Sequence, residues 1–559
     1  MPSCPSLSAT VRPAPAPSRA GRRVCLLRVL ALLALLAPAA LMARDIRRSP
    51  DLSFGLDYAD IARGRAARVL DVVNTDDREE KPLVSADGLV MFFTSDRRDD
   101  RPWANYLRMQ NRYDMDVWVS TRLAIAADGE SWSQPVNLGA PINSSGDEDV
   151  AAIAPDGQGA YFTSLRPGWE SDGGPFYHAR LKGARWSELR GLGGGINDFF
   201  NSRDRSVRFK VYGASISADG ASFYFATTLN SPDGTQQIWV SHLRDGVWGF
   251  PQNLGPSVNG PGGSCAPFIA ADGKTLFFAA DRPQGYGGDD IYMTVKIGGT
   301  WLEAENVGAP INTAGDDAFL SVPASGERVY LSSSRDGDND IFVAPLPEIM
   351  RPGQVVILGG RVIDRVSGEP IAADIAIEDL RSGVTIYNAV SNASSGRYTL
   401  VLEPGRDYAI SVSASGYGFS SHRYTVPVTA SYDERQNDIL LEPLRSGSEV
   451  TLTNIFYDYN SFELRPESQL ELNRLVRLMS EREGMRITVC GHTDSVGGER
   501  YNAQLSLRRA EAVRRYVSEV GGIDAARIDV RGLGSAQPAA PNDTEEGRQK
   551  NRRITFVVE

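Results

Sequence analysis

The chain has 559 residues, whereas a single hydrophobic core seldom serves more than about 250–300 residues, so several domains are expected. The formal net charge of -11 argues against nucleic acid as the main partner. Hydrophobic residues (42%) and charged residues (23%) are at ordinary levels for a globular protein, while 55 Gly and 32 Pro favour many turns and therefore much β-structure.

Residues 1–43 are predicted to be a signal peptide. An apolar run at 29–43 follows five arginines, Arg12, Arg19, Arg22, Arg23 and Arg28. A basic segment, a short apolar run and small residues for cleavage form the pattern of an export signal, and the run is shorter than the roughly 20 residues of a spanning helix. Cleavage after Ala39 or Ala43 is expected, an uncleaved N-terminal anchor is the alternative, and residues 44–66 are interpreted as a linker.

The chain has four cysteines, and we expect no disulfide framework. Cys4 and Cys25 lie in or before the predicted signal, and Cys265 and Cys490 fall in different predicted domains. No cysteine follows the apolar run at a lipobox position, so a lipid anchor is not predicted. We also predict no cofactor and no metal.

Residues 67–347 contain five copies of one pattern, in which a D-G or S-G turn precedes an alternating apolar strand and a second strand. The central glycines are 69, 63, 53 and 53 residues apart: Gly88, Gly157, Gly220, Gly273 and Gly326. Three or four strands in repeating units of about 50–70 residues are typical of a β-propeller. We therefore expect an all-β propeller of about five blades, and six blades would need one divergent copy.

The segment 69–82, before the first copy, is similar to the segment 308–320 of the last copy. This similarity predicts that an N-terminal strand completes the final blade and leaves no open sheet edge. The repeats resemble the WD40-like (PD40) propeller family, which includes the periplasmic TolB. The resemblance implies an architecture, and a surface for protein partners, more than it implies a particular activity.

Aspartates recur at fixed places in these copies. Asp-Arg pairs begin at Asp96 and Asp281, and another aspartate precedes the second strand at Asp116, Asp290 and Asp340. Aspartate in tight loops commonly bonds backbone N–H groups, and we favour that structural role. The acidic loop at 336–340 resembles the start of a calcium loop, but it lacks the required Gly and distal Glu.

Residues 354–444 contain short alternating strands separated by turns, which predicts a small β-sandwich. The pattern G-x-V-x-D, G-x-P-I, G-x-Y and S-x-x-G-Y resembles the carboxypeptidase regulatory-like domain. These residues maintain a fold, so the resemblance favours a spacer over a ligand site.

Residues 448–559 alternate between strand and helix patterns, which predicts an α+β domain with a βαβαβ order and a mixed sheet. We expect a strand and turn at 454–464, helices at 465–481, 499–520 and 545–551, and strands at 485–492, 526–534 and 552–559.

The loop between the second predicted strand and the long helix carries the chemistry. Asp494 follows the strand end, and Gly497 and Gly498 let the chain turn before the helix. On that helix, Asn502 and Arg509 share a face with Ser506. An Asp and an Arg held a few ångströms apart can bind a zwitterion, whose carboxylate meets the guanidinium and whose ammonium meets the Asp. A salt bridge that merely supports the turn is the alternative.

The motifs G-H-T-D (491–494), N-x-x-L-S-x-x-R-A (502–510) and N-R-R (551–553) resemble the OmpA C-terminal family, which includes the peptidoglycan-associated lipoprotein. The resemblance covers 448–559. It implies that Asp494 and Arg509 bind the diaminopimelate residue of peptidoglycan stem peptides. It also implies that four neighbours line the groove: Thr493, Asn502, Leu505 and Arg553.

These expectations combine into one functional hypothesis. The chain would be an exported, non-enzymatic protein of the periplasm or outer membrane that binds peptidoglycan and presents its propeller to an envelope protein. No G-x-S-x-G or H-E-x-x-H motif is present. Two alternatives remain open: a peptidoglycan-targeted hydrolase with a site in the propeller, and a TolB-like or secretion-machinery component.

Overall fold

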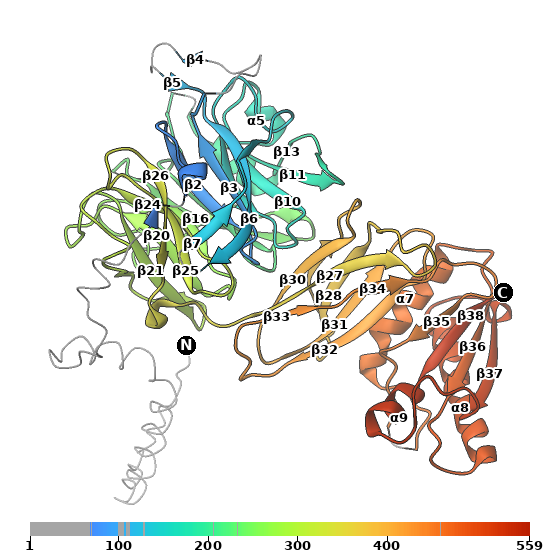
Figure 1. Ribbon diagram of the computed structural model, residues 1–559. Helices are drawn as coiled ribbons and strands as arrows, with labels where there is room; N and C mark the ends of the chain where they lie inside the picture. The colour runs from blue at the N-terminus through green and yellow to red at the C-terminus, as the bar shows by residue number, and fades with distance from the viewer. Residues whose placement is uncertain are drawn as a thin grey trace, which may run out of the picture. The chain divides into compact units, whose positions relative to one another are not determined.

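The computed structural model describes residues 67–68, 70–98, 106–107, 112–126, 129–204, 206–231, 233–458 and 460–559 (Figure 1). The predicted signal peptide and linker, with Cys4 and Cys25, lie outside the described residues. Cys265 and Cys490 are buried and free. Among the helices that are described, none combines the length and the hydropathy needed to cross a membrane.

In the described part of 67–345, five antiparallel sheets of four or five strands are present, one for each sequence copy, and β4 (Tyr106–Leu107) and β5 (Arg112–Tyr113) form a separate two-stranded pair. The inner strands are β2 (Glu79–Val84), β9 (Glu148–Ile153), β14 (Val211–Ile216), β19 (Cys265–Ile269) and β24 (Asp317–Ser321). The second strands are β3 (Val90–Ser95), β10 (Gly159–Ser164), β15 (Ser222–Thr227), β20 (Thr275–Ala280) and β25 (Arg328–Ser333). The third strands are β6 (Asp116–Ala126), β11 (Phe176–Lys182), β16 (Gln237–Arg244), β21 (Asp290–Ile297) and β26 (Asp340–Pro345).

Short outer strands finish the first four sheets: β7 (Gly129–Trp132), β8 (Val136–Asn137), β12 (Arg185–Trp186), β13 (Arg190–Gly191), β17 (Val247–Trp248), β18 (Gln252–Asn253), β22 (Thr300–Trp301) and β23 (Glu305–Asn306). The fifth sheet ends instead with β1 (Ala67–Arg68), which pairs with β26. Connections carry β4 (Tyr106–Leu107), β5 (Arg112–Tyr113), α4 (Leu70–Val73), α5 (Trp169–Asp172) and α6 (Gly194–Asn201). An N-terminal strand therefore joins the sheet of the last copy.

The inner strands are neighbours in a cyclic order. β2 contacts β9, β9 contacts β14, β14 contacts β19, β19 contacts β24, and β24 contacts β2 again. The turn after each inner strand ends in the glycine of its copy, with a positive φ of 64° to 68° at Gly88, Gly157, Gly220, Gly273 and Gly326. An L-residue is strained at such a φ, which explains why Gly recurs there.

A repeated asparagine joins neighbouring sheets. The Asn143 amide donates to the carbonyl of Val117 and accepts from its N–H, both at 3.0 Å. Asn312 holds Ile291 in the same way. Asn74 does so with Ile341, both bonds at 3.0 Å, although the two residues are 267 positions apart. This clamp ties residues before the first sheet to the third strand of the last sheet.

The recurrent charged residues have structural partners. Arg97 bonds the buried Glu79 at 2.9 Å, and Arg335 bonds the buried Asp317 at 2.8 Å. Asp96 accepts from the backbone N–H of Arg78 at 3.0 Å, so this aspartate joins two segments 18 residues apart rather than bonding within its own loop. Within the described residues, no group of three His, Cys, Asp or Glu side chains is arranged to hold a metal ion.

Residues 356–441 form two four-stranded sheets around one apolar core. One sheet contains β27 (Val356–Asp364), β30 (Arg397–Leu402), β33 (Asp433–Gln436) and β34 (Ile439–Leu441), and the other contains β28 (Asp374–Asp379), β29 (Thr385–Val390), β31 (Arg406–Ser413) and β32 (Ser420–Val426). The 3-10 turn η1 (Glu348–Met350) precedes them.

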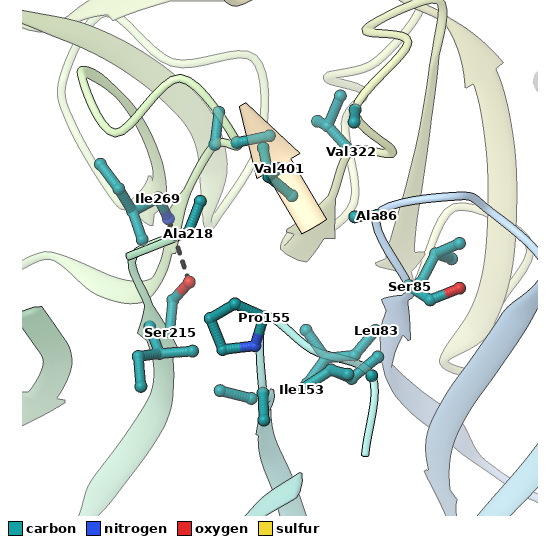
Figure 2. Close-up of a pocket in the computed structure, with 18 of the residues that line it drawn as sticks. Leu83, Ser85, Ala86, Ile153, Pro155, Ser215, Ala218, Ile269, Val322 and Val401 are labelled. Carbon is teal, nitrogen blue, oxygen red and sulfur yellow. Dashed lines mark hydrogen bonds between the residues drawn. The ribbon is translucent and has the colours of Figure 1, made fainter. Parts of the chain in front are cut away.

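An apolar cavity of about 110 Å³ lies where the turns after the five inner strands converge (Figure 2). The residue before the Asp or Ser of each turn is small or apolar: Ala86, Pro155, Ala218, Ala271 and Ala324. Val401 of β30 closes the cavity, and it packs with Ile357 and Ala324. The domain expected to be a spacer therefore also covers one end of the repeat domain.

The C-terminal domain has a mixed sheet in the order β35-β38-β36-β37, with β36 and β37 parallel, as predicted. Its elements are β35 (Glu449–Leu452), η2 (Pro466–Ser468), α7 (Gln469–Ser480), β36 (Ile487–His492), α8 (Glu499–Arg515), the π-helical turn η3 (Tyr516–Val520), η4 (Ala525–Arg527), β37 (Ile528–Gly534), α9 (Glu545–Asn551) and β38 (Ile554–Val558).

The strand predicted at 454–464 is wrong. The first strand is β35, in which Val450 and Leu452 face the core while β35 pairs with β38. The described residues of 454–464 form a loop closed by an isolated bridge between Tyr457 and Leu464. The alternation of apolar and polar residues favours the more aromatic segment 454–464 as a strand, but pairing with β38 selects the earlier segment Glu449–Leu452.

Helix α8 packs unusually close to the sheet through glycine. A Cβ atom on Gly491 would lie 2.1 Å from the carbonyl oxygen of Ser506, and one on Gly532 would lie 2.5 Å from that of Ala503. Both contacts are with backbone, which cannot move aside cheaply. The glycine of G-H-T-D therefore sets the distance between α8 and the strand that precedes Asp494.

Replacement of Gly491 by Ala should destabilise the C-terminal domain by about 2 kcal/mol, a typical cost of overpacking. Chemical denaturation would measure the change in stability, and hydrogen exchange of the α8 amides would measure it at the helix itself. Gly484→Ala is the control, because no atom lies within 4 Å of its Cβ position. Equal stability of the two variants would contradict the close packing.

Replacement of Asn74 by Ala should lower the stability of the repeat domain by about 1–3 kcal/mol, because it leaves two buried backbone groups of Ile341 unpaired. Thermal unfolding and limited proteolysis would measure the loss. Asn143→Ala removes the corresponding clamp between two sheets that are adjacent in sequence, and it should lower the stability by a similar amount. A loss seen only for Asn143→Ala would show that the terminal clamp contributes nothing.

Candidate functional site

The loop after β36 fixes Asp494 at the end of the sheet. The backbone N–H of Thr493 donates to the Gly534 carbonyl at 2.9 Å, which continues the pairing with β37. Asp494 Oδ1 accepts from the Val496 N–H at 3.0 Å. Gly497 has a φ of 99° and lets the chain turn into α8. The Asp494 carboxylate is therefore held by a backbone group of the turn that contains it, and Asp494 is 9% exposed.

Two polar residues of α8 support this loop. Asn502 is buried, and its amide donates to the carbonyl of Val496 at 3.1 Å and to that of Asp494 at 3.4 Å. Ser506 Oγ accepts from the Gly534 N–H at 3.0 Å. Asn502 thus shapes the loop that carries Asp494, while Leu505, one turn further along, is half-buried.

Arg509 lies on the same helix and is 8% exposed. Its Nε donates to the Ser461 carbonyl at 3.0 Å, and its guanidinium lies 4.7 Å from the centre of the Tyr457 ring. Burial lowers the pKa of Arg509, and nearby Asp494 partly opposes that effect. In the part of the chain that is described, Arg509 has no ion pair, and no hydrogen bond from Nη1 or Nη2 is present.

Asp494 forms its ion pair with a residue that sequence reasoning missed. Arg552 Nη1 bonds Asp494 Oδ2 at 2.7 Å, while Nη2 bonds Glu545 at 2.7 Å and also bonds Gln549. Arg553, predicted from the same N-R-R motif, instead donates to the Gln537 carbonyl at 3.1 Å. The motif offered two adjacent arginines, and only the end of α9 at Asn551 decides which one faces Asp494.

The remaining motif residues are buried. Thr493 is 5% exposed, and its Oγ1 has no hydrogen-bond partner among the described residues. His492 lies beneath the loop, where burial lowers its pKa to about 4 and keeps the ring neutral near pH 7. Cys490 is a small buried side chain.

The arrangement separates two charges that could have neutralised each other. No ion pair within 4.0 Å links Asp494 to Arg509 in the described residues, so the salt-bridge alternative does not apply to this pair. Arg509 instead uses a neutral carbonyl and an aromatic ring, which leaves Nη1 and Nη2 for a planar anion such as a carboxylate. Asp494 can accept a cation through oxygen lone pairs that Val496 and Arg552 leave unused.

Comparisons with known proteins match this part of the chain. The OmpA family matches residues 456–552. The outer-membrane lipoprotein YfiB of Pseudomonas aeruginosa is 39% identical over 106 residues, which are 19% of this chain and 62% of that protein. The probable lipoprotein YiaD of Escherichia coli is 37% identical over 117 residues, which are 20% of this chain and 53% of that protein. The chain thus spans less than two thirds of either relative.

One solved structure, the peptidoglycan-associated lipoprotein from Burkholderia pseudomallei, is 30% identical, covers 19% of this chain and 88% of that chain, and has a TM-score of 0.18. The family match itself identifies residues 456–552 as an OmpA family domain. The matched relatives are outer-membrane proteins and lipoproteins, and the chain is a cell-envelope protein of the periplasm or outer membrane.

Proposed function

We propose that this protein binds peptidoglycan non-covalently through its C-terminal domain and has no catalytic activity of its own. Arg509 receives the carboxylate, and Asp494 the ammonium, of the zwitterionic centre of a diaminopimelate residue. The supporting observation is that Arg509 is held in place by Ser461 and Tyr457 without any carboxylate partner among the described residues. The OmpA family match over 456–552 supports the same proposal.

Each part of the pocket has a defined task in this proposal. Asn502 holds the loop carbonyls so that Asp494 stays at the sheet edge. Arg552 fixes the orientation of the Asp494 carboxylate from its other side. Leu505 offers an apolar contact beside Arg509, and the unpaired Thr493 Oγ1 gives a further polar atom near the loop. Arg553 donates from Nη2 to the Gln537 carbonyl, and its buried Nη1 has no hydrogen-bond partner among the described residues, so it stays a candidate neighbour of the pocket.

We propose that residues 67–347 form a closed five-bladed propeller that binds an envelope protein. The cyclic order of the inner strands and the Asn74 clamp support closure. Because the β-sandwich domain covers the end of the repeat domain at Ala86 and Ala324, a partner would use the other end or the sides.

Replacement of Asp494 or Arg509 by Ala should weaken binding to purified peptidoglycan at least about tenfold, because each removes a charge-assisted hydrogen bond to the ligand. A sedimentation assay with intact sacculi would measure the bound fraction. Asp529→Ala, which changes an exposed carboxylate of β37 in the same domain, should bind like the unaltered chain. Full retention of binding by both site variants would refute the site.

The purified chain should leave peptidoglycan intact. Zymography on a peptidoglycan gel, with a known muramidase as positive control, tests this expectation. A cleared band from the chain that persists in the Asp494→Ala variant would favour a hydrolase centred elsewhere, such as in the repeat domain.

A further inference from the structure

Three of the five sheets in the repeat domain contain the same buried charged pair. The carboxylate is the first residue of the inner strand and lies five residues after the clamp asparagine of its sheet, which is Asn74, Asn143 or Asn312. The arginine lies two residues after the second strand. The pairs are Arg97 with Glu79 at 2.9 Å, Arg166 with Glu148 at 3.6 Å, and Arg335 with Asp317 at 2.8 Å.

Two hydroxyl groups complete each of these pairs. One belongs to the residue after the clamp asparagine and donates to the carboxylate: Thr75, Ser144 and Thr313. The other belongs to the last residue of the second strand, donates to the same carboxylate and accepts from the arginine Nε: Ser95, Ser164 and Ser333. The charge and the Nε of the arginine are therefore satisfied within the sheet.

The fourth sheet, which contains β19 and β20, keeps the arginine in the same place. Its clamp asparagine is Asn259, which bonds both backbone groups of Ile238. Arg282 lies two residues after β20, and its Nη2 donates to the Val258 carbonyl at 2.8 Å. The arginines of the paired sheets donate to the carbonyl at this same place, directly before the clamp asparagine: Val73, Ile142 and Ile311.

The usual partners of this arginine are missing in the fourth sheet. Ser264 stands where the paired sheets have Glu or Asp, and its hydroxyl donates to the Val258 carbonyl at 2.8 Å. Gly260 and Ala280 stand at the two hydroxyl positions. Among the described residues, the buried Nε of Arg282 has no hydrogen-bond partner, and Arg282 forms no ion pair. The arginine is thus placed for a carboxylate that its own sheet does not supply.

The surroundings of Arg282 suit an incoming anion. Burial lowers the pKa of Arg282, and Tyr292 and the exposed Glu303 oppose only part of that effect. A Cβ atom on Gly260 would lie 3.3 Å from the guanidinium carbon, so no side chain covers it from that side. The loop at 260–263 has no charged residue, whereas the corresponding loops of the paired sheets contain aspartate: Asp76, Asp77, Asp147 and Asp316.

Arg282 lies at the end of the repeat domain that the β-sandwich leaves uncovered. β20 begins after the turn at Gly273, one of the turns that converge on the cavity closed by Val401, and it ends at Ala280. Arg282 follows at the opposite end of the sheet and is half-buried, so a ligand can reach it from solvent.

We propose that the fourth sheet of the repeat domain binds a ligand carboxylate at Arg282, in the place that Glu or Asp takes in the paired sheets. The carboxylate accepts from Nη2, as it does in those sheets, and from Nε, which Ala280 leaves without an acceptor. The group arrives on a slender stem like that of an acidic side chain. This site is independent of the peptidoglycan site proposed for the C-terminal domain.

Calorimetry on the full chain with two blocked amino acids tests this proposal. N-acetyl-aspartate amide carries the carboxylate, and N-acetyl-asparagine amide has the same size without the charge. The aspartate probe should bind at least about tenfold more tightly, because it accepts charge-assisted hydrogen bonds from Arg282. Acetate distinguishes two sources of the group: equal affinity assigns the site to free carboxylates, weaker affinity assigns it to acidic side chains, and both outcomes support the site.

Variants of the pair locate the binding. Arg282→Gln should abolish the advantage of the aspartate probe. Ser264→Asp should also abolish it, because the chain then supplies its own carboxylate, and this variant should raise the unfolding temperature of the repeat domain. Ser264→Ala changes the same residue without adding a charge and should keep the advantage. Arg244→Ala, at an exposed arginine of the same domain, should keep it too.

The second open arginine of the chain needs its own control. Arg509→Ala should keep the advantage of the aspartate probe, and an advantage lost only in that variant would place the binding in the C-terminal domain and overturn the proposal. Equal affinity of the unaltered chain for both probes, or an advantage that survives Ser264→Asp, would also overturn it. Ser264→Asp decides the matter even where Arg282→Gln does not fold.

Discussion

The close approach of α8 to the sheet is the constraint on which the C-terminal site depends. Gly491 and Gly532 bring backbone against backbone, so the helix cannot slide outward to relieve a contact. That distance places Asn502 under the loop of Asp494 and Arg509 beside Ser461 and Tyr457. A larger separation would remove Asn502 from beneath the Asp494 loop and Arg509 from its contacts with Ser461 and Tyr457.

The two arginines near Asp494, Arg552 and Arg509, differ in how their charges are compensated. Arg552 is bonded to Asp494 and Glu545, so this arginine is already compensated. Arg509 is buried with no such compensation among the described residues, and burial of an unpaired charge is costly. The Tyr457 ring and the Ser461 carbonyl recover part of this cost. A ligand carboxylate would recover more, which gives the site a physical preference for anions at Arg509.

Much of this organisation could be predicted from the sequence, for identifiable reasons. Gly88 and its four counterparts mark the repeats because glycine tolerates the positive φ of the turn that each repeat contains. The similarity of segment 69–82 to segment 308–320 has another cause, since each contains a clamp asparagine, Asn74 or Asn312. The strand predicted at 454–464 is wrong because pairing with β38, which selects Glu449–Leu452 instead, is a long-range property that local sequence does not show. The sequence does not reveal that Arg552 bonds Asp494, because which of two adjacent arginines faces Asp494 depends on where α9 ends.

Several buried polar groups of the repeat domain are paired with other groups of that domain. In the repeat domain, each clamp asparagine satisfies both its own amide and a neighbouring strand, and Arg97 and Arg335 end on buried carboxylates. Such closed networks stabilise a scaffold and leave little free capacity for a ligand. At Arg509 of the C-terminal domain, no carboxylate partner is present among the described residues. The free Nη1 and Nη2 atoms of Arg509 thus distinguish it from Arg97 and Arg335, whose charges are already compensated by buried carboxylates.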